Sequence, residues 1–179
     1  EIRRLADGDE LAIGALRWVA RELPGHTDGQ IVLHAPAAGL LIAGDQVLPR
    51  ISPNVSVWPL EPDADPLSEF LETLEALLRL PERLLVLPSH GRPFGGLHRR
   101  IRQLELHHRQ RLAEVAAACG RPRTAYQVAR VLFPRRLDPH QATFALGESI
   151  AHLNHLVARG DLLRRRSPGP EVDRFLRRG

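Results

Sequence analysis

Three polar residues stand beside short apolar runs in the first half of the chain, where they could act together as metal ligands. His26 lies between two candidate strands, Asp45 directly follows the apolar residues 40–43, and His90 closely follows residues 84–87. Each has a glycine next to it, and glycine lets the backbone pass close to an ion while rigid strands aim the side chains. Two imidazoles and one carboxylate are a partial ligand set for zinc or a similar ion. One such signal alone is usually a turn residue, but the three in this order predict a metal site.

The order of these motifs resembles the second half of the metallo-β-lactamase superfamily, where Gly-His-Thr-x-Gly, Gly-Asp and Gly-His-Gly each stand at a strand end. The chain shows Gly25-His26-Thr27-Asp28-Gly29, then Gly44-Asp45, then Ser89-His90-Gly91, with serine where the family usually has the first glycine. The resemblance implies that His26 binds the first of two metal ions, that Asp45 bridges both, and that His90 binds the second. It makes Asp45 the catalytic carboxylate of a site that activates water to attack an ester, thioester, amide or phosphodiester.

The family motif His-x-His-x-Asp-His, which supplies the other ligands, is absent from residues 1–179. The pairs His107-His108 and His152/His155 lack its spacing and lie in helical patterns, and the chain contains no methionine. We therefore expect this chain to be the C-terminal part of such an enzyme. Two divalent ions, which we expect to be zinc, should bind the full-length protein, and this chain alone should bind metal weakly or not at all. A missing N-terminal half, or a second copy in a homo-oligomer, should cover its sheet.

The elements expected in the first part alternate between strands and a helix. Asp65-Pro66 predicts a helix start, because aspartate caps helices well and proline suits the first helical position. The strands are predicted at residues 10–13, 16–23, 30–33, 40–43 and 84–87, and the helix runs from residue 66 to Pro81. With the resemblance, this pattern predicts an α+β fold in which residues 1–97 form half of an αββα metallo-β-lactamase sandwich.

Residues 98–179 are predicted to form a second, small domain. A helix from Leu97 to near Gly120, a short helix capped by Thr124 and a third helix over residues 138–159 precede a ribbon of residues 162–166 and 171–175 with a turn at 167–170. Three helices and a ribbon form a winged helix-turn-helix. This arrangement matches the appendage found after the catalytic domain in one branch of the superfamily, which includes bacterial proteins of undefined substrate and an animal mitochondrial endoribonuclease.

Charge is distributed unevenly along the chain. All 25 basic residues are arginine; residues 1–90 hold 7 arginines against 14 acidic residues, and residues 91–179 hold 18 against 7, giving net charges of −7 and +11. Such an excess in the second part can attract polyanions. The third helix is poor in basic residues, so we expect no sequence-specific DNA binding. Arg164-Arg165-Arg166 on the wing leaves weak, salt-labile RNA binding open.

Other sequence features limit where the chain acts. No apolar run approaches 18 residues and no signal peptide is visible, so we expect no membrane partner. The single Cys119 excludes an internal disulfide and fits a reducing cytoplasm. Residues 51–63, which contain three prolines and a tryptophan, are either a wall facing the substrate or a plain connector.

Three functions are therefore open from the sequence. The first is a metal-dependent hydrolase of small esters or thioesters, similar to glyoxalase II. The second is a metal-dependent endoribonuclease whose arginine-rich winged helix contacts RNA. The third is a non-catalytic binding module. Because one scaffold can host many reactions, the resemblance alone does not choose between the first two.

Overall fold

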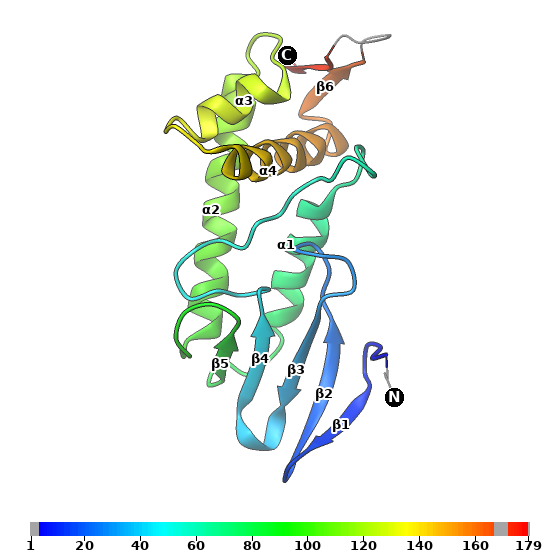
Figure 1. The fold of residues 1–179 in the computed structure, drawn as a ribbon, viewed down its shortest axis with the longest axis vertical. Coiled ribbons are helices and arrows are strands. Elements are labelled where there is room, and N and C mark those ends of the chain that lie inside the picture. Colours follow the sequence, from blue (N-terminus) through cyan, green and yellow to red (C-terminus); the bar gives the residue numbers. More distant parts are fainter. Residues whose placement is uncertain (1–3, 167–171, 179) are drawn as a thin grey trace. The chain divides into compact units, whose positions relative to one another are not determined.

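The computed structural model describes residues 4–166 and 172–178 (Figure 1). Contacts between Cα atoms divide the chain into two compact units, one of residues 1–53 and 69–105, the other of residues 54–68 and 106–179. The fold combines one sheet, four α-helices and a two-stranded ribbon, which makes it α+β as expected. The domain boundary predicted at residue 97 stays a prediction. In the described part of the chain, no helix is long and apolar enough to cross a membrane.

The first unit contains a five-stranded sheet in the order β1-β2-β3-β4-β5 (Figure 1). Neighbouring strands are antiparallel except β4 and β5, which are parallel. The strands are β1 (Glu10–Ile13), β2 (Leu16–Glu22), β3 (Ile31–Ala35), β4 (Leu40–Gly44) and β5 (Leu85–Pro88), with the 3₁₀ turn η1 (Pro36–Ala38) between β3 and β4. All five strands lie where the sequence predicted them, and every strand end agrees within two residues.

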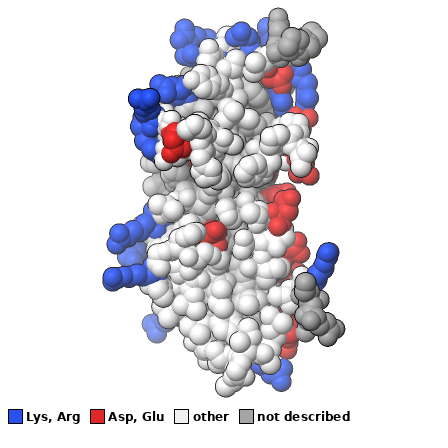
Figure 2. Space-filling view, viewed as in Figure 1, with Lys and Arg blue, Asp and Glu red and all other residues white. Residues whose placement is uncertain are grey.

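The two faces of this sheet differ in exposure around β3 and β4, whereas Trp18 and Ala20 in β2 are buried on the same face as Leu33. Val32, Leu41 and Val86 lie on one face and are fully buried. The register places Leu33 beside Ile42 on the other face, where both side chains are only half-buried. Figure 2 shows that the surface over the strands carries few charged side chains. An apolar sheet face of this kind usually packs against another layer.

Two helices supply the apolar surface that completes the core of the first unit. α1 (Pro66–Leu77) begins as the sequence predicts, because the Asp65 side chain accepts a hydrogen bond of 3.0 Å from the Ser68 backbone N–H. α2 (Leu97–Ala118) passes from the first unit into the second after residue 105. The buried positions of the two helices in this unit repeat every three or four residues: Phe70, Leu74, Leu77, Leu97, Ile101 and Leu104.

The second unit contains the rest of α2, two further helices and a ribbon. Thr124 caps α3 (Ala125–Leu132) through a capping box with Gln127. Asp138 caps α4 (Pro139–Ala158), and Pro139 occupies its first turn. The strands β6 (Leu162–Arg165) and β7 (Arg174–Arg177) pair antiparallel.

One predicted strand of the ribbon was placed wrongly. The sequence predicted residues 171–175, whereas β7 covers Arg174–Arg177. The shift follows from burial of Phe175, which is 2% exposed and pairs with Arg123 through two backbone hydrogen bonds of 2.8 and 3.0 Å. That contact comes from a segment about fifty residues away, so local sequence does not predict it. The predicted turn at residues 167–170 lies outside the described residues.

The polar residues in the C-terminal half of α4 are buried within the second unit. Ser149 and His152 are fully buried and Asn154 is 6% exposed. The Asn154 amide donates to the carbonyls of Pro62 and Ala64 at 3.0 and 2.9 Å. These polar residues therefore anchor the segment 54–68 onto α4.

His108 also belongs to this buried polar set. Its ring stacks on that of His152 with centroids 5.4 Å apart, and Nδ1 of His108 lies 3.3 Å from Nε2 of His152. The ring of His107, the preceding residue in α2, meets that of His108 edge to face with centroids 5.2 Å apart. Burial lowers the pKa of His108 to about 3 and that of His152 to about 4, so both imidazoles are neutral at pH 7.

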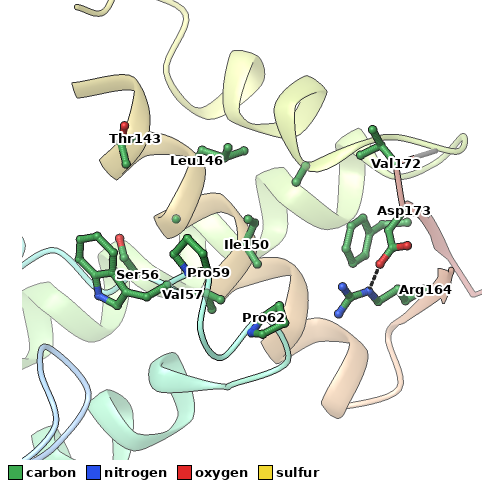
Figure 3. A pocket seen from close by; sticks show the side chains of 14 residues that line it. Ser56, Val57, Pro59, Pro62, Thr143, Leu146, Ile150, Arg164, Val172 and Asp173 are labelled. Carbon is green, nitrogen blue, oxygen red and sulfur yellow. Dashed lines mark hydrogen bonds and ion pairs between the residues drawn. The ribbon is translucent and has the colours of Figure 1, made fainter. Parts of the chain in front are cut away.

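An apolar pocket of 470 Å³ opens in the second unit between residues 56–62, α4 and the ribbon (Figure 3). Pro59, Pro62 and Ile150 line it, and Arg164 lies at one end, where its Nε donates to Asp173 at 2.6 Å. The segment 51–63 was predicted to be either a wall facing the substrate or a plain connector, and several of its residues between Ser56 and Pro62 line this pocket.

Candidate metal centre

His26, Asp45 and His90 converge at one edge of the sheet in the first unit, as the sequence predicted. Nε2 of His26 lies 3.6 Å from Oδ2 of Asp45, and Nε2 of His90 lies 3.6 Å from Oδ1 of the same carboxylate. Asp45 directly follows β4 and His90 follows β5. Because β4 and β5 are parallel, their carboxyl ends meet at the same edge, which brings the two side chains together.

The position of His26 depends on the glycine before it. Gly25 has a φ of +115°, and a Cβ there would lie 2.5 Å from the Cα of Phe70 in α1. The hydroxyl of Thr73 donates to the carbonyl of Pro24 at 3.0 Å. Only glycine allows the loop to approach the α1 backbone this closely, so Gly25 fixes where His26 stands.

The three residues have the chemistry of metal ligands. One imidazole nitrogen faces each of the two oxygens of Asp45, so this carboxylate lies between the two histidine side chains. Oδ1 of Asp45 is buried and accepts no hydrogen bond, which leaves an acceptor available for a cation. Side-chain exposure is 20% for His26, 30% for Asp45 and 71% for His90, so the site opens on the His90 side. Nitrogen and carboxylate oxygen donors suit zinc and similar divalent ions.

The ligand set within this chain is partial. Over residues 4–166 and 172–178, no three His, Cys, Asp or Glu side chains form a cluster that could hold an ion by itself. The arrangement therefore fits metal binding that is completed by further ligands.

Two further buried polar groups lie near the strand ends. Gln46, the residue after Asp45, is fully buried, and neither atom of its amide has a hydrogen-bond partner. His34 in β3 is 8% exposed; burial, and then the charge of Arg21, lower its pKa, so it is neutral at pH 7. Neither was singled out from the sequence, where a glutamine after the Gly-Asp motif carries no separate signal.

A cleft of 710 Å³ adjoins the metal-ligand candidates on the His90 side. Residues 48–51, which follow Asp45, form one wall, and residues 90–94 form the other. Arg50 and Arg92 line this cleft. We missed both from the sequence, although their places soon after Asp45 and His90 are the signal that could have identified them.

Sequence comparison with known families gives two matches along the chain. A profile described as metallo-beta-lactamase superfamily matches residues 2–90, and one described as metallo-beta-lactamase-like, C-terminal domain matches residues 112–178. The chain belongs to the metallo-beta-lactamase superfamily. The resemblance to this superfamily is thereby confirmed, and membership in it implies the use of divalent metal ions.

Known relatives of this superfamily member agree in both sequence and fold. A solved beta-lactamase domain protein from Burkholderia ambifaria is 48% identical, with a TM-score of 0.95 over 99% of this chain and 53% of that one. A probable metallo-hydrolase, YqjP, of Bacillus subtilis is 30% identical over 145 residues, which are 79% of this chain and 45% of that protein. A hydroxyacylglutathione hydrolase of Fuscovulum blasticum is 31% identical over 93 residues, 52% of this chain and 34% of that protein. The chain thus spans about half, or less, of the length of these relatives.

Proposed function

We propose that this chain is the C-terminal portion of a dinuclear metal-dependent hydrolase of small esters or thioesters. The observation that carries the proposal is the Asp45 carboxylate with an imidazole 3.6 Å from each of its oxygens. Two divalent ions, when bound, would supply Lewis acidity and lower the pKa of water. The identity with a hydroxyacylglutathione hydrolase over 93 residues supports a thioester as substrate.

Each ligand residue has a distinct role in this proposal. Asp45 would lie between the two ions and offset part of their mutual repulsion. His26 and His90 would each hold one ion as a neutral imidazole, which adds no negative charge and preserves the ion's acidity. The exposed position of His90 would leave room for substrate on its side of the site. Zinc is the ion that we propose.

The excess of arginine in residues 91–179 favours a second candidate, an endoribonuclease whose winged helix contacts RNA. We propose that the three helices and the ribbon of the second unit form this winged helix. Three ion pairs weigh against the RNA role, however. Arg164 and Arg166 both pair with Asp63, at 2.6 and 2.5 Å, and Arg164 also pairs with Asp173. Ser149, His152 and Asn154 in the C-terminal half of α4 are buried, so that half offers no polar surface for reading DNA bases.

The test is an assay of the whole protein against a panel of thioesters and single-stranded RNA, with and without a chelator. We expect chelator-sensitive thioester hydrolysis that the Asp45→Asn variant loses. Chelator-sensitive RNA cleavage without thioesterase activity would favour the nuclease. Absence of both activities from zinc-loaded protein would favour a non-catalytic binding module.

A further inference from the structure

The cleft beside His90 presents two arginines that have no ion pair or hydrogen bond within the described residues. Arg50 and Arg92 are both exposed and line the same 710 Å³ cleft as His90. Arg164 and Arg166, by contrast, form ion pairs with Asp63, and Arg164 also with Asp173. Two guanidinium groups without acidic partners, on the walls of one concave surface, attract an anion.

Specific contacts hold the walls that carry these arginines. Arg100 donates from Nε to the carbonyl of Leu48 at 2.6 Å and from Nη2 to the carbonyl of Ile51 at 2.8 Å. It therefore fixes the backbone on both sides of Arg50. Burial lowers the pKa of Arg100, but a guanidinium stays protonated near neutral pH.

The second wall is fixed against the first. Gly91 has a φ of +90°, and a Cβ there would lie 2.8 Å from Cγ of Pro49. Phe94 exchanges two backbone hydrogen bonds with Val86 of β5, at 2.8 and 3.0 Å. Arg92 therefore lies in a short loop that is pinned at both ends, which places its charge reproducibly beside the cleft.

We propose that Arg50 and Arg92 bind a carboxylate of the substrate, so that this hydrolase acts on short acyl thioesters whose acyl chain ends in a carboxylate. The proposal rests on the proposed function of the adjoining site. Pro49, Ile51 and Phe94 line the cleft and would contact the methylene groups of the acyl chain. The planar guanidinium groups would bind the carboxylate in a bidentate manner. Hydrolysis consumes one water: the C–S bond breaks, the acyl carbon gains the oxygen, and the thiol leaves with a proton.

The test compares two thioesters that differ in the terminal carboxylate, S-succinyl-N-acetylcysteamine and the neutral S-butyryl-N-acetylcysteamine. In zinc-loaded whole protein, Arg50→Ala and Arg92→Ala should each raise the KM for the succinyl compound about tenfold more than that for the butyryl compound, since a hydrogen bond to a charged group contributes about 1.5 kcal/mol or more. Arg102→Ala, an exposed arginine of α2 outside the cleft, is the matched control and should behave like the wild type. Equal losses for both thioesters would overturn the proposal.

A second measurement does not depend on turnover. Phenylglyoxal modification of arginines is mapped by peptide mass spectrometry with and without succinate. Succinate should slow modification of Arg50 and Arg92 but not of Arg102. If neither thioester is hydrolysed and this protection is still seen, the proposed function fails while the carboxylate site stands. Protection by an RNA oligonucleotide but not by succinate, or no protection at all, would overturn the carboxylate site.

Discussion

Gly25→Ala should be one of the most damaging single-methyl changes in the first unit. The new Cβ would lie 2.5 Å from both the Cα and the N of Phe70, which are backbone atoms that cannot turn away. Overpacking of this kind costs about 1–3 kcal/mol. The φ of +115° adds about 1–3 kcal/mol of backbone strain for a residue with a side chain. Together these effects should lower the free energy of unfolding by about 4 kcal/mol.

Gly29→Ala is the matched control in the same loop. Its φ is +62°, and a Cβ there would meet nothing within 4 Å, so it should cost only the left-handed backbone penalty of about 1–2 kcal/mol. The assay is urea denaturation of both variants and of the wild type. The Gly25 variant should also retain less zinc, because His26 moves with the loop. Equal destabilisation by the two substitutions would refute the close approach between the loop and α1.

Three further outcomes are expected. Asp63→Ala removes the shared partner of Arg164 and Arg166, so fluorescence anisotropy should show tighter, salt-labile binding of single-stranded RNA than in the wild type; unchanged binding would mean that the pairing does not mask these arginines. His152 has a folded pKa of about 4 against an ordinary 6.5, so its contribution to stability is present above pH 6.5 and is lost as pH falls toward 4. The His152→Gln variant should therefore lose less stability than the wild type between pH 7 and pH 5. An identical dependence of stability on pH in the two proteins would contradict this. The half-buried face around Leu33 and Ile42 should bind an apolar dye or self-associate when residues 1–179 are produced alone, and a monomer without dye binding would contradict that interpretation.

The local part of the fold could be predicted from the sequence because its signals are local. Three helix starts are marked by a capping aspartate or threonine, namely Asp65, Thr124 and Asp138. Each of these side chains makes the expected capping hydrogen bond. Trp18, within the predicted strand 16–23, and Cys119, near the end of the predicted helix that starts at Leu97, are 5% and 0% exposed. Such features depend on neighbours within a few residues, which the sequence shows directly.

The remaining features depend on pairings across the chain. The stacking of His108 on His152 joins positions 44 residues apart, and Asn154 donates to carbonyls about 90 residues away. The helical pattern around these residues does not show which distant partners they meet. Arg50 was missed for a related reason, since only the fold shows that its wall faces His90 across one cleft. The convergence of His26, Asp45 and His90 could be predicted because each lies near a strand end with a glycine beside it, and their binding of metal stays a prediction.

The central claim is that Asp45 bridges two metal ions held in part by His26 and His90. The most direct measurement is the zinc content of the whole protein after dialysis, by elemental analysis, for the wild type and for Asp45→Asn. The amide keeps the shape of the carboxylate but loses its charge, so the bridge should fail. We expect about two zinc ions per wild-type protein, as in other two-metal hydrolases, and at most one in the variant. Two zinc ions retained by Asp45→Asn would contradict the assignment.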